Sequence, residues 1–281
     1  ECGSGDAVRR MLKRVRVVVA TVSTMSLQQT LLAALDFSVA FVDEASQILE
    51  PYLLPIYTVA DVKKYVLVGD QKQLPAVVVQ GSEASAIEDP LLNSLGISDC
   101  AESLFSRMLH IFMERGRTDL YCQINTQGRM HPDLFGFVNH NFYGDTLQCV
   151  PLDHQKQTLS ECYPNIPLCE GRCGELMSRL LSNRILFLDC KPCDDGLNDK
   201  INSAEANLVA LCIEAFARIY EANGRELSSD EIGVIVPYRN QICQIKTSLR
   251  QCGLDRFADA AIDTVERFQG SQRDIMICSL T

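Results

Sequence analysis

Two adjacent carboxylates, Asp43 and Glu44, stand at the end of a Val-rich apolar run and before a stretch of small residues. The run, residues 39–42, predicts a buried strand, and the small residues after it predict the start of a helix. In parallel α/β sheets, ligands bind beyond the carboxyl ends of the strands. An Asp at such a place can hold Mg²⁺ directly or through water, and the adjacent Glu can orient or deprotonate an attacking water. The alternative is that the two acids only cap the N-terminus of the helix.

A second cluster of polar residues, with the sequence GDQKQLP, follows the apolar run at residues 65–68. The run predicts another buried strand, and Gly69 lets the backbone turn at its end. Gln73 in this cluster can sense a phosphate by hydrogen bonding. The alternative is that the cluster is a plain turn between two elements.

A third cluster, with the sequence QGRMHP, follows the apolar run at residues 120–124 and contains Arg129. Arg binds phosphate oxygens with a planar fork of donors, and a second domain can carry it into a shared cleft. His131 in the same cluster is typical of a helix start or a core position rather than of a ligand. The last candidate lies at residues 262–274, where a strand, a polar loop with Gly and another strand follow one another.

The elements around these clusters follow from the hydrophobic pattern. Continuous apolar runs favour strands of a parallel sheet that are buried on both faces, and we expect them at residues 15–20, 39–42, 65–68, 184–188, 232–236 and 274–280. Helical spacing predicts helices over residues 45–57, 102–114, 203–220 and 239–249. We expect a surface connection at residues 81–100 and an irregular stretch at residues 144–182. The predicted fold class is α/β, with two units in tandem.

The composition limits the classes of protein to which the chain can belong. The 281 residues are 47% hydrophobic and 22% charged, as in globular proteins, which excludes a disordered chain, a collagen and a coiled coil. No apolar run approaches the roughly 18 residues that span a bilayer, and the first residues lack the pattern of a signal peptide. The net charge of −10 excludes a basic footprint over the whole surface but not a local basic groove. Thirteen cysteines, an odd number scattered over apolar segments, favour a reducing, intracellular compartment.

Five motifs occur in the order DEAS, GDQKQLP, QGRMHP, VPYRNQ and DTVERFQGSQRD. The set resembles the superfamily 1 helicases, specifically the branch that contains the nonsense-mediated-decay helicase and the eukaryotic replication helicase–nuclease. The resemblance runs from about residue 15 to the end. It implies two RecA-like domains, with residues 1–118 as the C-terminal part of the first and residues 119–281 as the second. Because the chain begins without Met and ends inside a predicted strand, we expect it to be part of a longer protein.

The resemblance also implies an activity, in which ATP and Mg²⁺ are bound and the protein moves 5′ to 3′ along single-stranded DNA or RNA. Asp43 then binds Mg²⁺, Glu44 orients or deprotonates the attacking water, and Gln73 senses the γ-phosphate by hydrogen bonding. Arg129 corresponds to an arginine finger from the second domain. The further residues implied on the nucleotide side are Gly69, Asp70, Arg239, Gln269, Gly270 and Gln272, and those implied at the nucleic-acid backbone are Thr21 and Thr264.

The sequence departs from the family pattern in several places. Gly128 replaces the aromatic residue that often precedes the Arg of the third motif, and Gln272 replaces a Glu that often serves the ribose. No G-x-x-x-x-G-K-[S/T] loop occurs, since residues 3–5 lack the Lys and the preceding strand, and the late Arg-containing motif is missing too. That loop holds the phosphates with its backbone N–H groups and Lys. We therefore expect the chain by itself to bind ATP weakly and not to hydrolyse it.

Alternative interpretations stay open from the residues alone. Cys190 and Cys193 have the C-x-x-C spacing and, with Cys162, Cys169 and Cys173, are the candidates for a zinc site. A non-catalytic interaction module and a remodelling ATPase that displaces proteins without unwinding are alternative functions of the same fold. The basic run at residues 9–16 either tracks phosphates or forms a solvated helix face. Both DNA and RNA stay open as the partner.

Overall fold

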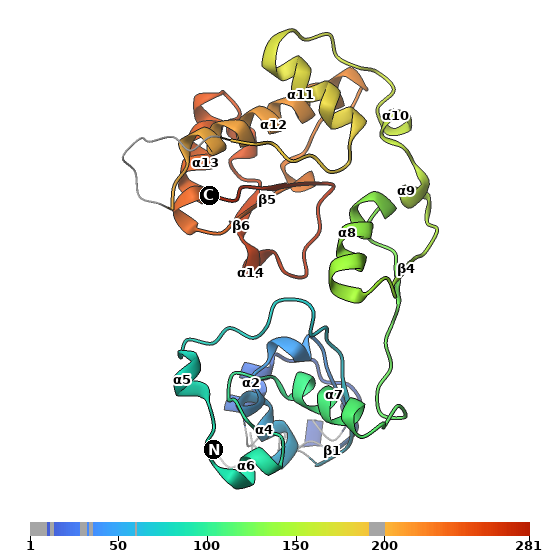
Figure 1. Ribbon diagram of the computed structural model, residues 1–281, viewed down its shortest axis with the longest axis vertical. Coiled ribbons are helices and arrows are strands. Elements are labelled where there is room, and N and C mark those ends of the chain that lie inside the picture. The colour runs from blue at the N-terminus through green and yellow to red at the C-terminus, as the bar shows by residue number, and fades with distance from the viewer. Residues whose placement is uncertain (1–9, 12–13, 29–32, 34–35, 60, 191–199) are drawn as a thin grey trace. The chain divides into compact units, whose positions relative to one another are not determined.

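The computed structural model describes residues 10–11, 14–28, 33, 36–59, 61–190 and 200–281. The chain divides into two compact units, Glu1–Ile124 and Asn125–Thr281 (Figure 1). Within the described residues, no helix is both long and apolar enough to cross a bilayer. Residues 3–5 of the glycine-rich start, and Arg9 and Lys13 of the basic run, lie outside the described residues.

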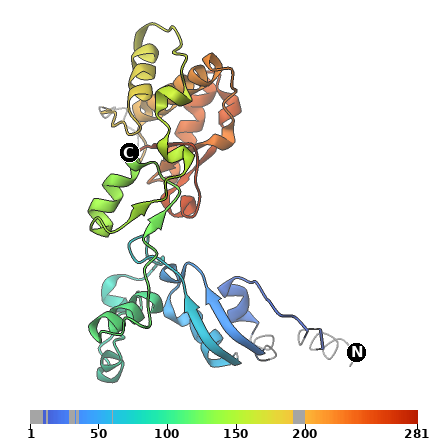
Figure 2. The ribbon, with the colours of Figure 1, turned by 90° about the vertical axis from the view of Figure 1, so that its right-hand side faces the viewer.

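Two parallel strands form the sheet of the first unit (Figure 2). They are β1 (Asp36–Val42) and β2 (Asp61–Leu67), with Phe41 opposite Val66. Helix α4 (Glu50–Val59) lies between them in the sequence, because parallel strands need a crossover connection. The other elements of the unit are α2 (Val22–Leu27), η1 (Ala45–Gln47), α5 (Ser82–Ser85), α6 (Pro90–Ser94) and α7 (Leu104–Glu114).

Among the described residues, only one face of this sheet is covered. Val42 is buried in a core cluster with Ala45 and Leu53, which brings α4 against that face. Phe41 points to the other face, because successive side chains alternate along a strand, and it is 73% exposed. The prediction that these strands are buried on both faces is therefore wrong for the described part of this unit. An apolar run reports that a strand can be buried, but the layers around it decide how much of it is.

Other predictions for this unit have mixed outcomes. Residues 15–20 form no strand, and Val19 is 93% exposed. A strand needs a neighbour for its N–H and C=O groups, and no described strand pairs with this run. The helix predicted over residues 102–114 is confirmed as α7. The helix predicted over residues 45–57 divides into η1 and α4, and the surface connection at residues 81–100 contains α5 and α6.

The second unit holds a three-stranded parallel sheet in the order β6-β5-β7, and Figure 1 labels β5 and β6. The strands are β5 (Ile232–Val236), β6 (Ala261–Thr264) and β7 (Ile275–Cys278). Two long helices, α12 (Ser203–Ala222) and α13 (Arg239–Gln251), share one hydrophobic core with the sheet. These findings confirm the strands predicted at residues 232–236 and 274–280 and the helices predicted at residues 203–220 and 239–249.

Two further predictions for this unit are wrong. Residues 184–188 form no strand, and Phe187 is 75% exposed. Residues 144–182 are not irregular, because they contain several short helices and the 12-residue helix α11. Helix α11 buries Leu176 and Met177 against α12, and Cys173, Leu180 and Leu181 are partly buried beside them. These residues recur at helical spacing, so the helix carries an apolar stripe. The remaining elements are β3 (Thr126–Gln127), β4 (Gln148–Cys149), α8 (Pro132–Tyr143), α9 (Asp153–Lys156), α10 (Leu159–Cys162), α11 (Gly171–Ser182), η2 (Ser229–Glu231), η3 (Asp255–Phe257) and α14 (Val265–Phe268).

Parallel strands with helices packed on them make both units α/β, as predicted. Of the predicted site residues, Asp43 and Glu44 follow β1, the residues of the GDQKQLP motif follow β2, and Arg239 follows β5.

Candidate functional site

The two acids after β1 lie on a tightly held turn. Glu44 adopts φ 51° and ψ 37°, a left-handed conformation that residues other than glycine rarely take. Its N–H donates to Oδ1 of Asp43 at 3.0 Å, and its carboxylate accepts from Nε2 of Gln47 at 2.7 Å. The N–H of Ala45 donates to the Val68 carbonyl at 2.8 Å, which anchors the turn to the end of β2. Both carboxylates are exposed, and the Glu44 side chain makes no hydrogen bond that caps η1.

The loop after β2 packs directly on this turn. A Cβ atom on Gly69 would lie 2.8 Å from the backbone nitrogen of Ser46, so a side chain does not fit there. The φ angle of Gly69 is not left-handed, so close approach rather than turn geometry accounts for the glycine. The buried Ser46 hydroxyl accepts from the N–H of Asp70 at 3.2 Å. The Asp70 carboxylate in turn accepts from Nε2 of Gln73 at 2.9 Å and from the N–H of Lys72 at 2.9 Å.

A small pocket of about 130 Å³ lies where the loop after β2 meets Ser46 and the start of α7. Its volume is smaller than the range of about 300–1,000 Å³ that is typical of small-molecule sites, so the pocket does not hold a nucleotide by itself. Glu102 lines the pocket with Asp70 and Gln73. Burial raises the pKa of Glu102 above its ordinary value, while the nearby Arg107 opposes the rise. The DEAS motif contains Ser46 but does not reveal its contact, and no sequence signal marks Glu102.

In the second unit, the loop after β3 presents Arg129. The Arg129 side chain is exposed, and among the described residues it has no hydrogen bond or ion pair. The loop is fixed at its start by the Gln127 side chain and at its end by His131, which caps α8. A Cβ atom on Gly128 would lie 3.1 Å from Cδ1 of Leu152, so an aromatic residue at this position would need Leu152 to move.

The carboxyl ends of β5 and β6 bring two predicted residues together. Arg239 begins α13 just after β5, and Thr264 ends β6, its paired neighbour. The N–H of Thr264 donates to Oδ1 of Asp263 at 2.9 Å. A backbone N–H and the Thr264 hydroxyl donate to the Glu266 carboxylate, and with the nearby positive charge of Arg239 they hold the pKa of Glu266 below its ordinary value. Both predicted side chains therefore lie near Glu266 at this edge of the sheet.

The loop after α14 holds the other predicted residues of the last motif. Gly270 has φ 75°, which a residue with a side chain rarely adopts. Nε2 of Gln269 is buried and has no hydrogen-bond partner among the described residues, whereas Gln272 is exposed. The backbone carbonyl of Gln272 accepts from Nη1 of Arg273 at 2.7 Å.

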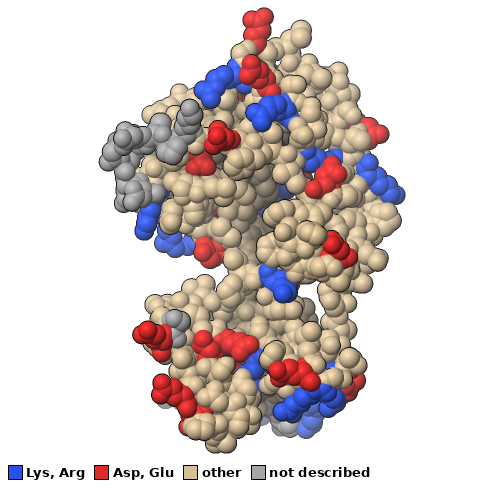
Figure 3. Space-filling view, in the orientation of Figure 1, with Lys and Arg blue, Asp and Glu red and all other residues tan. Residues whose placement is uncertain are grey.

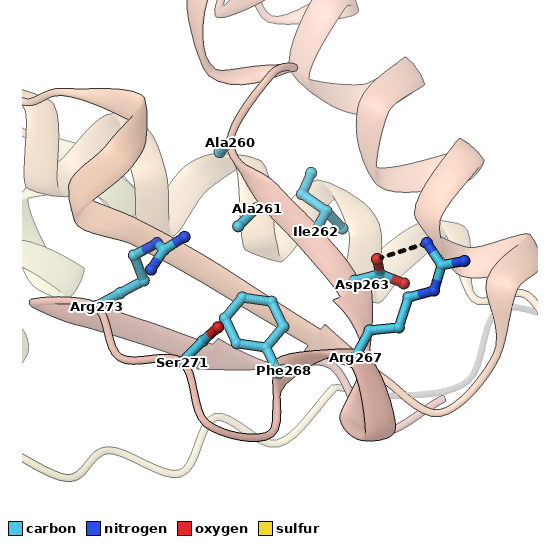
Figure 4. Close-up of a pocket in the computed structure, with 8 residues that line it drawn as sticks. All are labelled: Ala260, Ala261, Ile262, Asp263, Arg267, Phe268, Ser271 and Arg273. Atoms are coloured by element: carbon cyan, nitrogen blue, oxygen red, sulfur yellow. Dashed lines mark hydrogen bonds and ion pairs between the residues drawn. The ribbon is translucent and has the colours of Figure 1, made fainter. Parts of the chain in front are cut away.

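A pocket of about 340 Å³ opens between β6 and this loop (Figure 4). Its wall includes Phe268, Arg273 and the ion pair of Arg267 with Asp263, whose nitrogen and oxygen lie 3.5 Å apart. Six of the eight residues that line the pocket belong to the candidate stretch at residues 262–274, and Ala260 and Ala261 directly precede it. Of the predicted residues, Gln269, Gly270 and Gln272 do not line this pocket.

The predicted contact with nucleic acid in the first unit is Thr21. Its exposed hydroxyl caps α2, where Oγ1 accepts from the N–H of Thr24 at 3.2 Å. Arg14 and Arg16 of the basic run are exposed as well. On the face that Figure 3 shows, Lys and Arg side chains are interspersed with acids rather than gathered in one patch, in keeping with the net charge of −10.

The cysteine candidates form no zinc site in the described part of the chain, where no group of three or more His, Cys, Asp or Glu side chains is placed to hold a metal ion. Cys193 lies outside the described residues. Cys169 and Cys173 do lie together: burial, and then the neighbouring Cys169, raise the pKa of the Cys173 thiol. A pair of thiols is two ligands short of a structural zinc site.

Comparison with known proteins identifies the family. Two family models, both described as AAA domains, match residues 3–80 and 100–281. Helicase sen1 of Schizosaccharomyces pombe is 26% identical over 276 residues, which cover 97% of this chain and 14% of the relative. The DNA replication ATP-dependent helicase/nuclease DNA2 of Xenopus laevis is 28% identical over 273 residues, covering 93% of this chain and 23% of the relative. The regulator of nonsense transcripts 1 homolog of Arabidopsis thaliana is 28% identical over 251 residues, which cover 86% of this chain and 17% of the relative.

The chain thus spans less than a quarter of the length of each of these relatives. The matches nevertheless extend through both units. The chain belongs to the AAA-domain family of superfamily 1 helicases, in the branch of the nonsense-mediated-decay helicase and the replication helicase–nuclease, and its fold is RecA-like.

Proposed function

We propose that this chain forms part of an ATP-driven motor that moves 5′ to 3′ along single-stranded DNA or RNA. The observation that carries the proposal is the junction of two loops at the carboxyl ends of β1 and β2, where the Ser46 hydroxyl binds the N–H of Asp70. It places the acids of one motif and Gln73 of the next at the same end of a parallel sheet, where α/β proteins bind their ligands. We assign residues 1–118 to the first RecA-like domain and residues 119–281 to the second.

In the first domain, the chemistry of the donors suits a nucleotide with Mg²⁺. Mg²⁺ prefers oxygen ligands, and the carboxylate of Asp43 is exposed at the strand end. When bound, Mg²⁺ neutralises negative charge on the phosphates. Glu44 orients the attacking water, and its hydrogen bond with Gln47 fixes the direction of the carboxylate. Gln73, whose side chain is hydrogen-bonded to the Asp70 carboxylate, senses the γ-phosphate.

In the second domain, the exposed Arg129 guanidinium stabilises charge on the transferred phosphate as an arginine finger. The further contacts on the nucleotide side are Gly69, Asp70, Arg239, Gln269, Gly270 and Gln272. Thr21 and Thr264 bind phosphates of the nucleic acid. Closure and reopening of the two domains with each ATP then move these contacts along the strand. The odd number of cysteines supports an intracellular protein.

The test is ATP hydrolysis by the full-length protein that carries this chain, with single-stranded DNA, with single-stranded RNA and with neither. Wild type is compared with Glu44→Gln and with Glu88→Gln, an exposed Glu of the same domain that serves as the matched control. We expect stimulation by one polymer, a loss of at least about 10²-fold in Glu44→Gln, and no change in the control.

Absence of hydrolysis with either polymer, in a folded protein, would refute the motor and favour a non-catalytic interaction module. Polymer-stimulated hydrolysis without strand separation would instead favour a remodelling ATPase. We also expect the 281-residue chain alone not to hydrolyse ATP, because it has no G-x-x-x-x-G-K-[S/T] loop. A robust rate from the chain alone that Glu44→Gln abolishes would contradict this expectation.

A further inference from the structure

The Arg129 loop is held by side chains rather than by regular secondary structure. The Gln127 amide folds back over its own loop, where its Oε1 accepts from the N–H groups of Arg129 at 2.9 Å and Met130 at 2.7 Å. Its Nε2 donates to the Met130 carbonyl at 2.9 Å. One side chain therefore satisfies three backbone groups of the segment that carries Arg129.

A second layer of contacts comes from α9, 25 residues or more further along the chain. Gln155, which is only 4% exposed, donates from Nε2 to the Met130 carbonyl at 2.8 Å. The ring Nε2 of His154 lies 2.9 Å from the Gly128 carbonyl, within hydrogen-bond distance. Neither contact can be read from the QGRMHP motif, because both residues lie in a separate helix.

The backbone and the side chain of Arg129 differ in how they are held. The backbone of the loop is hydrogen-bonded from two directions, while the Arg129 guanidinium has no partner among the described residues. A loop that served only as a connection would not need its N–H groups bound by Gln127 and its carbonyl bound by the buried Gln155, because water would satisfy them. Catalytic groups, in contrast, must be held in place, since a misplacement of 1 Å can reduce a rate by about 10²-fold.

We propose that Gln127, supported by Gln155, is a positioning residue that aims Arg129 at the transferred phosphate. The inference rests on the proposed function, because it requires Arg129 to act on ATP. Gln127 acts through the loop backbone and does not itself touch the nucleotide. Its removal therefore lowers kcat for ATP hydrolysis and leaves the KM for ATP nearly unchanged, since an arginine finger stabilises the transition state rather than the bound ground state.

A double-mutant cycle in the full-length protein tests this proposal. Gln127→Met keeps the length of the side chain but removes its hydrogen bonds, and we expect kcat to fall by about 10- to 100-fold. Gln127→Glu keeps the oxygens that accept from the two N–H groups and is expected to retain more activity than Gln127→Met. In the Arg129→Ala background, Gln127→Met is expected to cause no further loss, because the group that it positions is already absent.

The control is Gln241→Met, which alters a fully buried amide of the same domain that holds Asn202 rather than the Arg129 loop. Its effect on kcat should be the same in the wild-type and Arg129→Ala backgrounds. If Gln127→Met lowers kcat by equal factors in both backgrounds, the residue is merely structural and the proposal is overturned. Thermal unfolding is followed for each variant, and Gln155→Met replaces Gln127→Met in the cycle if the latter does not fold.

The two ways of failing are distinct. If Arg129→Ala hydrolyses ATP as fast as wild type, the proposed role of Arg129 is wrong and the positioning role falls with it. If Arg129→Ala is slow but folded Gln127→Met retains the wild-type kcat, only the positioning role is refuted. A change in KM alone would likewise refute it.

Discussion

Replacement of Gly69 by Ala probes the contact between the two loops that carry Glu44 and Gln73. The added Cβ would lie 2.8 Å from the Ser46 nitrogen, 3.2 Å from its Oγ and 3.3 Å from the Ala45 nitrogen. Two of these three atoms are backbone, and Ala45 is tied to the end of β2 by a 2.8 Å hydrogen bond, so neither can rotate away. Overpacking of this kind costs about 1–3 kcal/mol. The lower entropy of the unfolded Ala chain offsets about 0.4–1 kcal/mol, so we expect the free energy of unfolding to fall by roughly 1–2 kcal/mol.

The same substitution should slow the reaction. Relief of the overlap requires the loop after β2 to move away from Ser46, which lengthens the 3.2 Å hydrogen bond from the N–H of Asp70. Gln73 moves with Asp70, because their side chains are hydrogen-bonded. A displacement of a few tenths of an ångström between Gln73 and Glu44 should lower kcat for ATP hydrolysis by about tenfold in the full-length protein.

The matched control is Gly136→Ala, inside α8, where no atom lies within 4 Å of the added Cβ. Here Ala should raise the free energy of unfolding by about 1 kcal/mol, because glycine is a poor helix former, and should leave kcat unchanged. Urea denaturation followed by circular dichroism measures both stabilities. The two substitutions are chemically identical and have opposite expected signs. An increase in stability for Gly69→Ala as well would refute the reasoning from the close contact.

Two further variants test the neighbourhood of this junction. Ser46→Ala removes the acceptor of the Asp70 N–H and should cost about 1 kcal/mol in the free energy of unfolding, with slower ATP hydrolysis; an unchanged kcat would contradict the link between the loops. Glu102→Gln tests the sign of a pKa shift. Because the folded-state pKa of Glu102 lies above its ordinary value of 4.5, ionisation costs the folded state stability as pH rises through that pKa. The melting temperature of Glu102→Gln should therefore exceed that of wild type at neutral pH and match it below about pH 4, and an advantage confined to acid pH would contradict the assignment.

The sequence alone determined the elements that are locally encoded. Helices α12 and α13 have apolar residues at helical spacing over three or more turns, and β5 and β7 are continuous apolar runs that are paired in the structure. The order of the five motifs by itself indicates the superfamily 1 helicases, because each motif is a short run of neighbouring residues. The positions of Asp43 and Glu44 after a parallel strand were predictable for the same reason.

Tertiary structure decided what depends on residues far apart in the chain. The apolar runs at residues 15–20 and 184–188 resemble strands, but no described strand pairs with them, and pairing is what makes a strand. Gly69 seemed to serve a turn, whereas the closeness of Ser46, 23 residues earlier, is what excludes a side chain. Gln155 holds the Arg129 loop from another helix. Hydrogen bonds and close contacts of this kind join residues that only the folded chain brings together, so no local pattern contains them.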